Sequence, residues 1–123
     1  MNVIDSSAWL SYFADEPSAG NFLAPIQDTE SQIVPVITLY EVFKVVLLES
    51  GENEALQVIA AMQKGNVTDF TSFLAISASR LSLKYSLPMA DSIILATARQ
   101  YNATIWTLDI DFKGLPGVNY FQK

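Results

Sequence analysis

Carboxylates dominate the chemistry available to this 123-residue chain, which has thirteen Asp and Glu residues and neither histidine nor cysteine. Without histidine there is no imidazole general base, no serine–histidine–aspartate triad and no histidine-based zinc site. Without cysteine there is no thiolate nucleophile, thiolate metal site or disulfide. Any reaction must use carboxylates, hydroxyl groups, a few Lys and Arg side chains, and a metal ion that these groups hold. Four carboxylates stand out by position: Asp5, Glu41, Asp91 and Asp109.

The elements that must position these acids are predicted by the hydrophobic pattern, which alternates between strands and helices. Strands are expected over residues 1–4, 33–36, 66–70, 104–107 and 118–121. Helices are expected over residues 7–14, 17–24, 38–50, 52–64, 72–85 and 88–101, with Ser6 or Ser7 as the first N-cap and Gly51 after the third helix. This alternation predicts a three-layer α/β/α sandwich around a central parallel sheet, in a single domain over residues 1–123.

The four acids all fall where such a sheet binds ligands, at the carboxyl ends of its strands. Asp5 directly follows the first strand, and Asp109 follows the strand over residues 104–107. Glu41 and Asp91 each lie in the first turn of a helix. We therefore expect the four carboxylates, which are distant in the sequence, to meet at one edge of the sheet.

A simpler explanation exists for each acid alone, because acids at helix starts cap free N–H groups and suit the helix dipole. The apolar neighbours of two of them argue against it. Asp91 shares a helical stripe with Ile94, Leu95 and Ala98, and Glu41 shares one with Val45 and Leu48. A buried, unpaired carboxylate is costly, so it must protonate, pair with a cation or hold a metal. Lys44, the only base in residues 1–62, is placed to pair with Glu41 but not with all four acids.

A divalent metal ion is the simplest shared counter-charge for this group. Oxygen ligands without His or Cys favour Mg²⁺ or Mn²⁺ over Zn²⁺. Such an ion acidifies a bound water and offsets the charge of a phosphodiester under attack. It also accommodates the net charge of −6, which divides into −8 over residues 1–62 and +2 over residues 63–123. The residues thus predict metal-assisted phosphodiester hydrolysis.

Four segments together resemble the PIN domain family, and most closely its VapC-type toxins. They are Asp5-Ser6-Ser7, Thr38-Leu39-Tyr40-Glu41, the run from Met89-Ala90-Asp91 to Ala98, and Thr107-Leu108-Asp109-Ile110-Asp111-Phe112. The resemblance covers nearly the whole chain and implies a Mg²⁺- or Mn²⁺-dependent endoribonuclease that acts as the toxin of a toxin–antitoxin pair. It also implies an RNA substrate, a homodimer and a cognate antitoxin bound in a groove.

The same resemblance assigns roles to individual residues. Asp5 and Asp91 become the principal metal ligands, and Glu41 holds a metal-bound water or helps to deprotonate it. Asp109 is favoured as the fourth acid. The remaining assignments are Asp111 as an outer-shell or substitute ligand, and Thr107 and Ser7 as hydrogen-bonding groups that orient the acids; for Ser7 a plain helix cap is an equal alternative.

Contact with RNA requires bases, and Arg80 and Lys84 lie four residues apart on one predicted helix. They form a candidate basic patch that Arg99 and Lys113 are able to extend. The alternative is that these are ordinary solvated charges, since Lys and Arg are mostly exposed in any protein. A partner interface is also plausible, because the predicted helix is apolar nearly all round between residues 42 and 48, apart from Lys44.

Two other functions compete with the ribonuclease. The first is a non-catalytic PIN-like module that binds a protein partner, which an acid at every expected position disfavours. The second is a Mg²⁺-dependent phosphatase or deoxyribonuclease; phosphatases with an Asp-x-Asp nucleophile place that pair after the first strand, where this chain has Asp5-Ser6-Ser7. The N-terminus has neither a basic region nor an apolar stretch typical of a signal peptide, so a cytoplasmic protein is expected.

Overall fold

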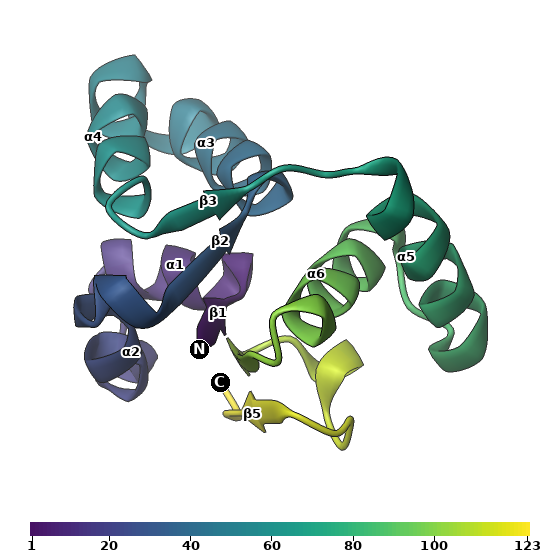
Figure 1. Ribbon diagram of the computed structural model, residues 1–123. Helices are drawn as coiled ribbons and strands as arrows, with labels where there is room; N and C mark the ends of the chain where they lie inside the picture. Colours follow the sequence, from purple (N-terminus) through teal and green to yellow (C-terminus); the bar gives the residue numbers. More distant parts are fainter.

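A five-stranded sheet forms the centre of the computed structural model, which describes all residues from 1 to 123 (Figure 1). The strands lie in the order β3-β2-β1-β4-β5, and all four neighbouring pairs are parallel. Their bounds are Asn2–Ile4 (β1), Gln32–Pro35 (β2), Asn66–Thr68 (β3), Thr104–Thr107 (β4) and Val118–Tyr120 (β5). The N-terminal strand is therefore central, with β2 on one side and β4 on the other.

Six α-helices connect and cover these strands. Their bounds are Ser6–Phe13 (α1), Leu23–Gln27 (α2), Val36–Ser50 (α3), Glu52–Met62 (α4), Ser72–Tyr85 (α5) and Met89–Gln100 (α6). Three 3₁₀-helices are added at Pro17–Phe22 (η1), Thr29–Ser31 (η2) and Ile110–Phe112 (η3). None of these helices combines the length and the hydrophobicity that a membrane span requires.

Alternate residues of β1 and β2 point to the two faces of the sheet, as the pleat requires. Ile4 and Val34 belong to a core shared with Trp9 of α1, Phe22, Val42 of α3 and residues of α4. Val3 and Ile33 belong to a second core shared with α6. Helices therefore cover both faces, and the predicted three-layer α/β/α sandwich with a parallel sheet is confirmed.

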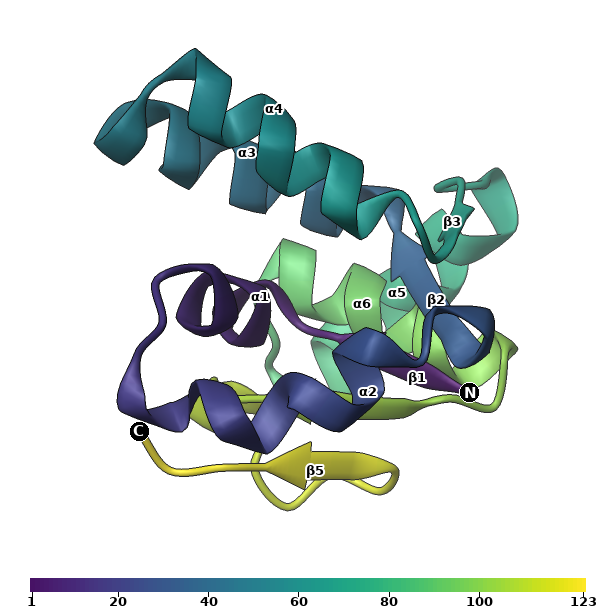
Figure 2. The same cartoon turned by 90° about the vertical axis from the view of Figure 1, so that its left-hand side faces the viewer.

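The helices α3 and α4 form a hairpin that extends from the sheet (Figure 2). Gly51 separates them with φ of 89°, a backbone conformation that favours glycine, and its N–H donates to the carbonyl of Leu47. Gly51 was predicted to follow this helix, and it does. The hairpin leaves Tyr40, Leu47 and Leu48 exposed.

Several predicted boundaries are wrong, each for a local reason. The first helix begins at Ser6, and its N-cap is Asp5, whose side chain accepts from the N–H of Ser7; neither serine is the cap. The segment expected as one helix over residues 17–24 begins as the 3₁₀-helix η1 and becomes α-helical at Leu23. The strand expected over residues 66–70 ends at Thr68, where its pairing with β2 stops.

Candidate metal-binding site

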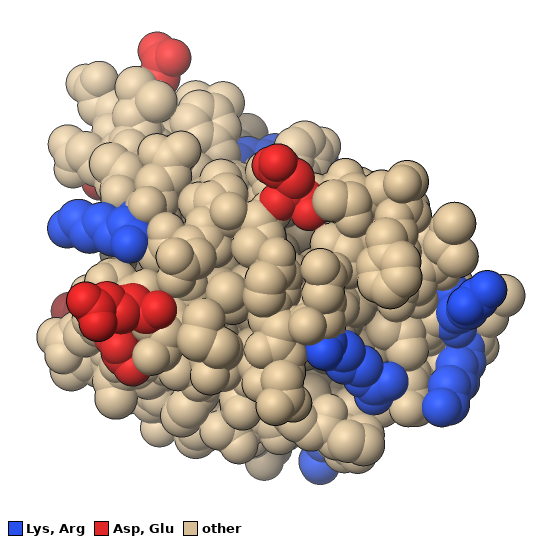
Figure 3. Space-filling model, in the orientation of Figure 1, with Lys and Arg blue, Asp and Glu red and all other residues tan.

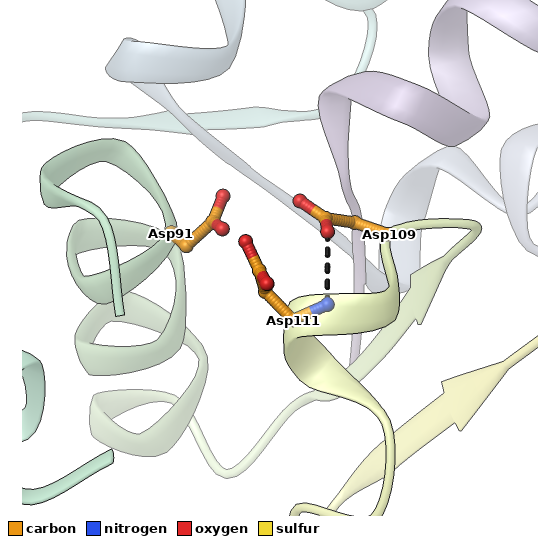
Figure 4. Close-up of side chains that lie close together, drawn as sticks. All are labelled: Asp91, Asp109 and Asp111. Atoms are coloured by element: carbon orange, nitrogen blue, oxygen red, sulfur yellow. Dashed lines mark hydrogen bonds between the residues drawn. The ribbon is translucent and has the colours of Figure 1, made fainter. Parts of the chain in front are cut away.

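Three aspartates meet at the carboxyl end of β4. Asp91 lies in the first turn of α6, whereas Asp109 and Asp111 lie in the turn that follows β4. One carboxylate oxygen from each side chain lies within 4.8 Å of one from each of the others. Figure 4 shows the Asp91 side chain pointing from its helix towards the other two. Carboxylate oxygens from the start of α6 and from the turn after β4, which are distant in the sequence, thus lie close together.

The turn that carries Asp109 is held by hydrogen bonds from backbone N–H groups to side-chain oxygens. The N–H of Asp109 donates to Oγ1 of Thr107 at 2.8 Å, and the N–H of Asp111 donates to Oδ1 of Asp109 at 2.9 Å (Figure 4). Asp109 is half-buried, whereas Asp111 is exposed. Asp109 therefore has a fixed position in the group, while no hydrogen bond fixes the side chain of Asp111.

Asp5 is nearly fully buried, with 3% of its surface exposed, and Ser7 and Thr107 hold its carboxylate. Its Oδ2 accepts from Oγ of Ser7 at 2.6 Å and from Oγ1 of Thr107 at 2.9 Å. The same Thr107 hydroxyl accepts the N–H of Asp109, so one side chain connects the acid after β1 to the acid after β4. Ser7 makes a similar link, because its Oγ accepts the N–H of Leu108 at 3.1 Å.

Burial and like charge raise the pKa values of two acids. Burial, followed by the nearby charges of Asp109 and Asp5, raises the pKa of Asp91 to about 8. Burial also raises the pKa of Asp5 above its ordinary value, against the opposing effect of its hydrogen bonds from Ser7 and Thr107. These mutual effects place Asp5 in the same electrostatic group as the three converging aspartates.

Glu41 lies on a different helix from Asp91. It lies on α3, half-buried, and its Oε1 accepts from Oγ of Ser6 at 2.7 Å. The pairing with Lys44 considered from the sequence does not occur: the Lys44 ammonium lies over the ring of Tyr40, 5.7 Å from its centroid. The only salt bridge in the molecule joins Lys123 to Glu16. No Lys or Arg therefore neutralises any of the site acids.

These residues fit a hard divalent cation. Every available ligand is a carboxylate oxygen, and Mg²⁺ and Mn²⁺ favour such ligands. Burial and the neighbouring aspartates raise the pKa of Asp91, and no Lys or Arg forms a salt bridge with the group. The structure brings Asp91, Asp109 and Asp111 together and links Asp5 to Asp109 through the Thr107 hydroxyl. Glu41, which was expected in the same group, hydrogen-bonds only to Ser6.

The predicted RNA-contacting bases lie elsewhere, on α5 and α6. The charged ends of Lys84 and Arg99 lie 5.2 Å and 5.4 Å from the ring centroid of Tyr85, and Arg99 Nη2 donates to the Tyr85 hydroxyl at 3.3 Å. Arg80 lies one turn before Lys84, whereas Lys113 lies over Tyr120. In Figure 3, the blue side chains over α5 lie apart from the red ones on this face.

Sequence reasoning missed two residues of these clusters, Ser6 as a partner of Glu41 and Tyr85 as the centre of the basic cluster. For Ser6, the available signal is a serine directly after an acid at a helix start, a pattern that equally fits a plain helix cap. For Tyr85, the one available signal was its place beside Lys84.

Comparison with known proteins identifies the family. The family model described as PIN domain matches residues 3–118. The chain therefore belongs to the PIN domain family. No curated protein sequence matches it.

Solved structures with this fold include bacterial toxins and their complexes. A toxin–antitoxin complex from Klebsiella pneumoniae contains a chain with 23% identity and a TM-score of 0.83, covering 97% of this chain and 96% of that one. VapC20 of Mycobacterium tuberculosis, a toxin that cleaves the sarcin–ricin loop, has 17% identity and a TM-score of 0.81, with 96% and 97% covered. DNA-bound VapBC from Salmonella typhimurium has 17% identity and a TM-score of 0.75, with 98% of each chain covered.

Proposed function

We propose that this protein is a Mg²⁺- or Mn²⁺-dependent endoribonuclease and the toxin of a toxin–antitoxin pair. The observation that carries the proposal is the convergence of Asp91, Asp109 and Asp111, with no basic residue to neutralise them. The buried Asp5 is linked to this group through Thr107. Membership of the PIN domain family and a fold shared with VapC toxins support it. An arrangement of unneutralised carboxylates at the carboxyl edge of a parallel sheet is suited to metal-assisted phosphodiester hydrolysis.

Asp91, Asp109 and Asp5 are the proposed ligands, with Asp111 available as a further or substitute ligand and Glu41 on the side of α3. A bound divalent ion supplies positive charge against the phosphate and lowers the pKa of a coordinated water. The protein's own residues prepare the site for it. Ser7 and Thr107 each place a hydroxyl hydrogen on the same oxygen of Asp5, so its other oxygen is the one left for a ligand.

Protons compete with the cation for this site. The pKa of about 8 means that Asp91 carries a proton at neutral pH in the metal-free protein. Binding of a cation therefore releases that proton, and metal affinity rises with pH up to about the pKa. Because Asp91 is only 8% exposed, its unpaired charge is poorly solvated until the cation binds.

RNA contact is proposed for Arg80 and Lys84, together with Arg99. None of them pairs with a carboxylate, although the protein has almost twice as many acids as bases. Tyr85 holds two of the three cations against its ring, which keeps them next to one another at the surface. Unpaired cations grouped in this way suit the phosphates of an RNA backbone.

An antitoxin and a second copy of the chain are the proposed protein partners. The fold neighbours that are toxin–antitoxin complexes support the first. On the α3–α4 hairpin, a shallow cleft of about 560 Å³ is bordered by Leu39, Phe43, Leu47 and Ile59. On α5, Phe73 and Ile76 are exposed. Two separate apolar surfaces are more than an isolated domain needs.

The central experiment measures RNA cleavage by the purified chain, freed of any partner, with Mn²⁺ or Mg²⁺ supplied. Cleavage is expected with metal and lost with EDTA or in Asp91→Asn, whose fold is checked by circular dichroism. The control Asp28→Asn removes the same charge from an exposed position before β2 and should cleave normally. A folded parent protein that cleaves no cellular RNA under these conditions would instead favour the non-catalytic binding module.

The toxin assignment has its own test. Induced expression of the parent chain should arrest bacterial growth, whereas expression of Asp5→Asn at the same level should not. Arrest by both forms would separate toxicity from the acid site and contradict the assignment.

A further inference from the structure

The first turn of α1 carries two serines in succession, and each binds a different acid. Ser7 donates to Asp5, which precedes it in the same turn. Ser6 donates to Glu41, 35 residues further along the chain on α3. The Ser6 side chain therefore bridges α1 and α3, whereas the Ser7 side chain links the ends of β1 and β4.

Ser6 itself is firmly placed. Only 8% of its surface is exposed, and the residue before it is hydrogen-bonded into the sheet edge, with the N–H of Asp5 on the carbonyl of Trp106 at 2.9 Å. The carbonyl of Asp5 then accepts from the N–H groups of Ala8 and Trp9, which fixes the helical turn containing Ser6. The Ser6 hydroxyl is thus a donor on a rigid support.

Glu41, in contrast, has no other fixing group. It is half-buried on α3, its side chain is long, and the nearest base in the sequence, Lys44, lies over Tyr40 instead. Its only side-chain hydrogen bond is the one from Ser6, at 2.7 Å. A flexible carboxylate loses rotamer freedom when it is held, so the group that holds it determines where its oxygens lie.

We propose that Ser6 is a positioning residue, which holds the Glu41 carboxylate against the first turn of α1, directly after the site acid Asp5. The inference rests on the proposed function, because Glu41 matters only if the acid site binds metal and RNA. Ser6 acts through Glu41 and touches no substrate. Outer-shell hydrogen bonds orient the ligands of metal sites, and their loss typically costs about 10- to 100-fold in metal affinity or activity.

Two measurements on the parent chain and on Ser6→Ala need no RNA cleavage. In the metal-free protein, three-bond NMR couplings should show one dominant χ1 rotamer for Glu41 in the parent and averaging in Ser6→Ala. Calorimetric titration with Mn²⁺ alone should show binding about 10-fold weaker in Ser6→Ala. Ser6→Thr retains the hydroxyl and should restore both results.

The matched control is Ser11→Ala. Ser11 is also a buried serine of α1, and its hydroxyl bonds to Ser18 rather than to any acid, so this variant loses a comparable bond away from the site. In RNA cleavage, Ser6→Ala should lower kcat about 10-fold with little change in KM, and Ser11→Ala should change neither. In a Glu41→Ala background, adding Ser6→Ala should have no further effect, because the acceptor is already absent.

Different measurements decide the positioning role of Ser6 and the ribonuclease function. If the parent binds Mn²⁺ but cleaves no RNA, the proposed function fails while the NMR and Mn²⁺ measurements still decide the role of Ser6. If Glu41 is already averaged in the parent, or if Ser6→Ala matches Ser11→Ala in rotamer, affinity and kcat, the positioning role is wrong. Should Ser6→Ala not fold, Glu41→Gln tests the acceptor side, since its amide oxygen still accepts from Ser6 and the rotamer should remain fixed.

Discussion

The acid site and the basic cluster around Tyr85 are built in opposite ways. The acids are fixed by the fold: Asp5 and Asp91 are buried, and the Asp109 carboxylate accepts the backbone N–H of Asp111. Hydroxyls of Ser7 and Thr107 join the ends of β1 and β4. The bases Lys84 and Arg99 are exposed and lie against the single ring of Tyr85. One region is preorganised, and the other is adaptable.

This contrast separates the two tasks of the proposed nuclease. A hard cation requires oxygens in a fixed arrangement, and burial makes their charge effective by excluding water. An RNA backbone presents many similar phosphates, so loosely held surface cations suffice to attract it. Mutations at the acid site should therefore act on turnover and metal binding, whereas mutations around Tyr85 should act on RNA affinity and its salt dependence.

The largest effect is expected within the acid site, where Asp109→Asn and Asp111→Asn should differ. Asp109 is half-buried, fixed by hydrogen bonds, and close enough to raise the pKa of both Asp5 and Asp91; Asp111 is exposed. We expect kcat to fall at least about 100-fold in Asp109→Asn and only about 10-fold in Asp111→Asn. Single-turnover RNA cleavage measures both, with Asp28→Asn as the charge control. An equal loss in the two variants would contradict this ranking.

The pH dependence of stability tests the burial of the acids. Asp91 has an ordinary pKa of 3.8 when unfolded and about 8 in the fold, so between these values the folded state binds a proton that the unfolded state lacks. The free energy of unfolding of the metal-free protein must then fall as pH rises through this window, with Asp5 acting in the same direction. At ~1.4 kcal/mol per pH unit, we expect a loss of about 4 kcal/mol between pH 5 and pH 8 in urea denaturation.

Asp91→Asn isolates this contribution. The neutral amide should flatten the pH profile and make the metal-free protein more stable than the parent at pH 8, while Asp28→Asn should keep the parental slope. Mn²⁺ should restore stability to the parent at pH 8 and do little for Asp91→Asn. A parent protein that grows more stable towards pH 8 without metal would show that Asp91 is not buried as described.

The strand-end positions of Asp5 and Asp109 were the part of the site that the sequence could predict, whereas the converging group includes Asp111 and not Glu41. Parallel strands bring their carboxyl ends to one edge, so the positions of Asp5 and Asp109 relative to their strands were enough to place them there. The alternation of strands and helices predicted the sandwich for the same reason. These are consequences of backbone topology, and they do not depend on side-chain rotamers.

The hydrogen-bond and ring contacts of individual side chains could not be predicted from backbone topology. The sequence offered Ser6 as a cap and Lys44 as a partner for Glu41, whereas the structure gives the cap to Asp5 and the hydrogen bond with Glu41 to Ser6. A helical spacing of three allows a contact without requiring it, and the Tyr40 ring is the nearer neighbour of Lys44. The link from Arg99 to Tyr85 depends on how α5 and α6 cross, which no local pattern encodes.

A smaller effect is expected when the basic cluster is neutralised. Replacing Arg80, Lys84 and Arg99 together with Gln should raise KM for RNA about 10-fold at low salt and leave kcat nearly unchanged, because no acid is disturbed. Each base that contacts a phosphate should lower the slope of log affinity against log salt by about 1. RNA cleavage and filter binding at salt concentrations between about 50 and 200 mM measure both. A fall in kcat with an unchanged salt slope would instead connect these bases to the acid site.

The smallest effect is expected for Tyr85→Phe, which keeps the ring and removes the hydroxyl that accepts from Arg99. Because the ring still attracts both cations, RNA affinity should change less than about 2-fold, whereas Tyr85→Ala should approach the loss caused by removing Lys84 and Arg99. The hydroxyl has a separate signature: the hydrogen bond from Arg99 lowers the pKa of Tyr85, so ultraviolet titration should show this tyrosine ionising earlier in the parent than in Arg99→Gln. If Tyr85→Phe impaired RNA binding as much as Tyr85→Ala, the hydroxyl would be the element that organises the cluster, and this region would be as preorganised as the acid site.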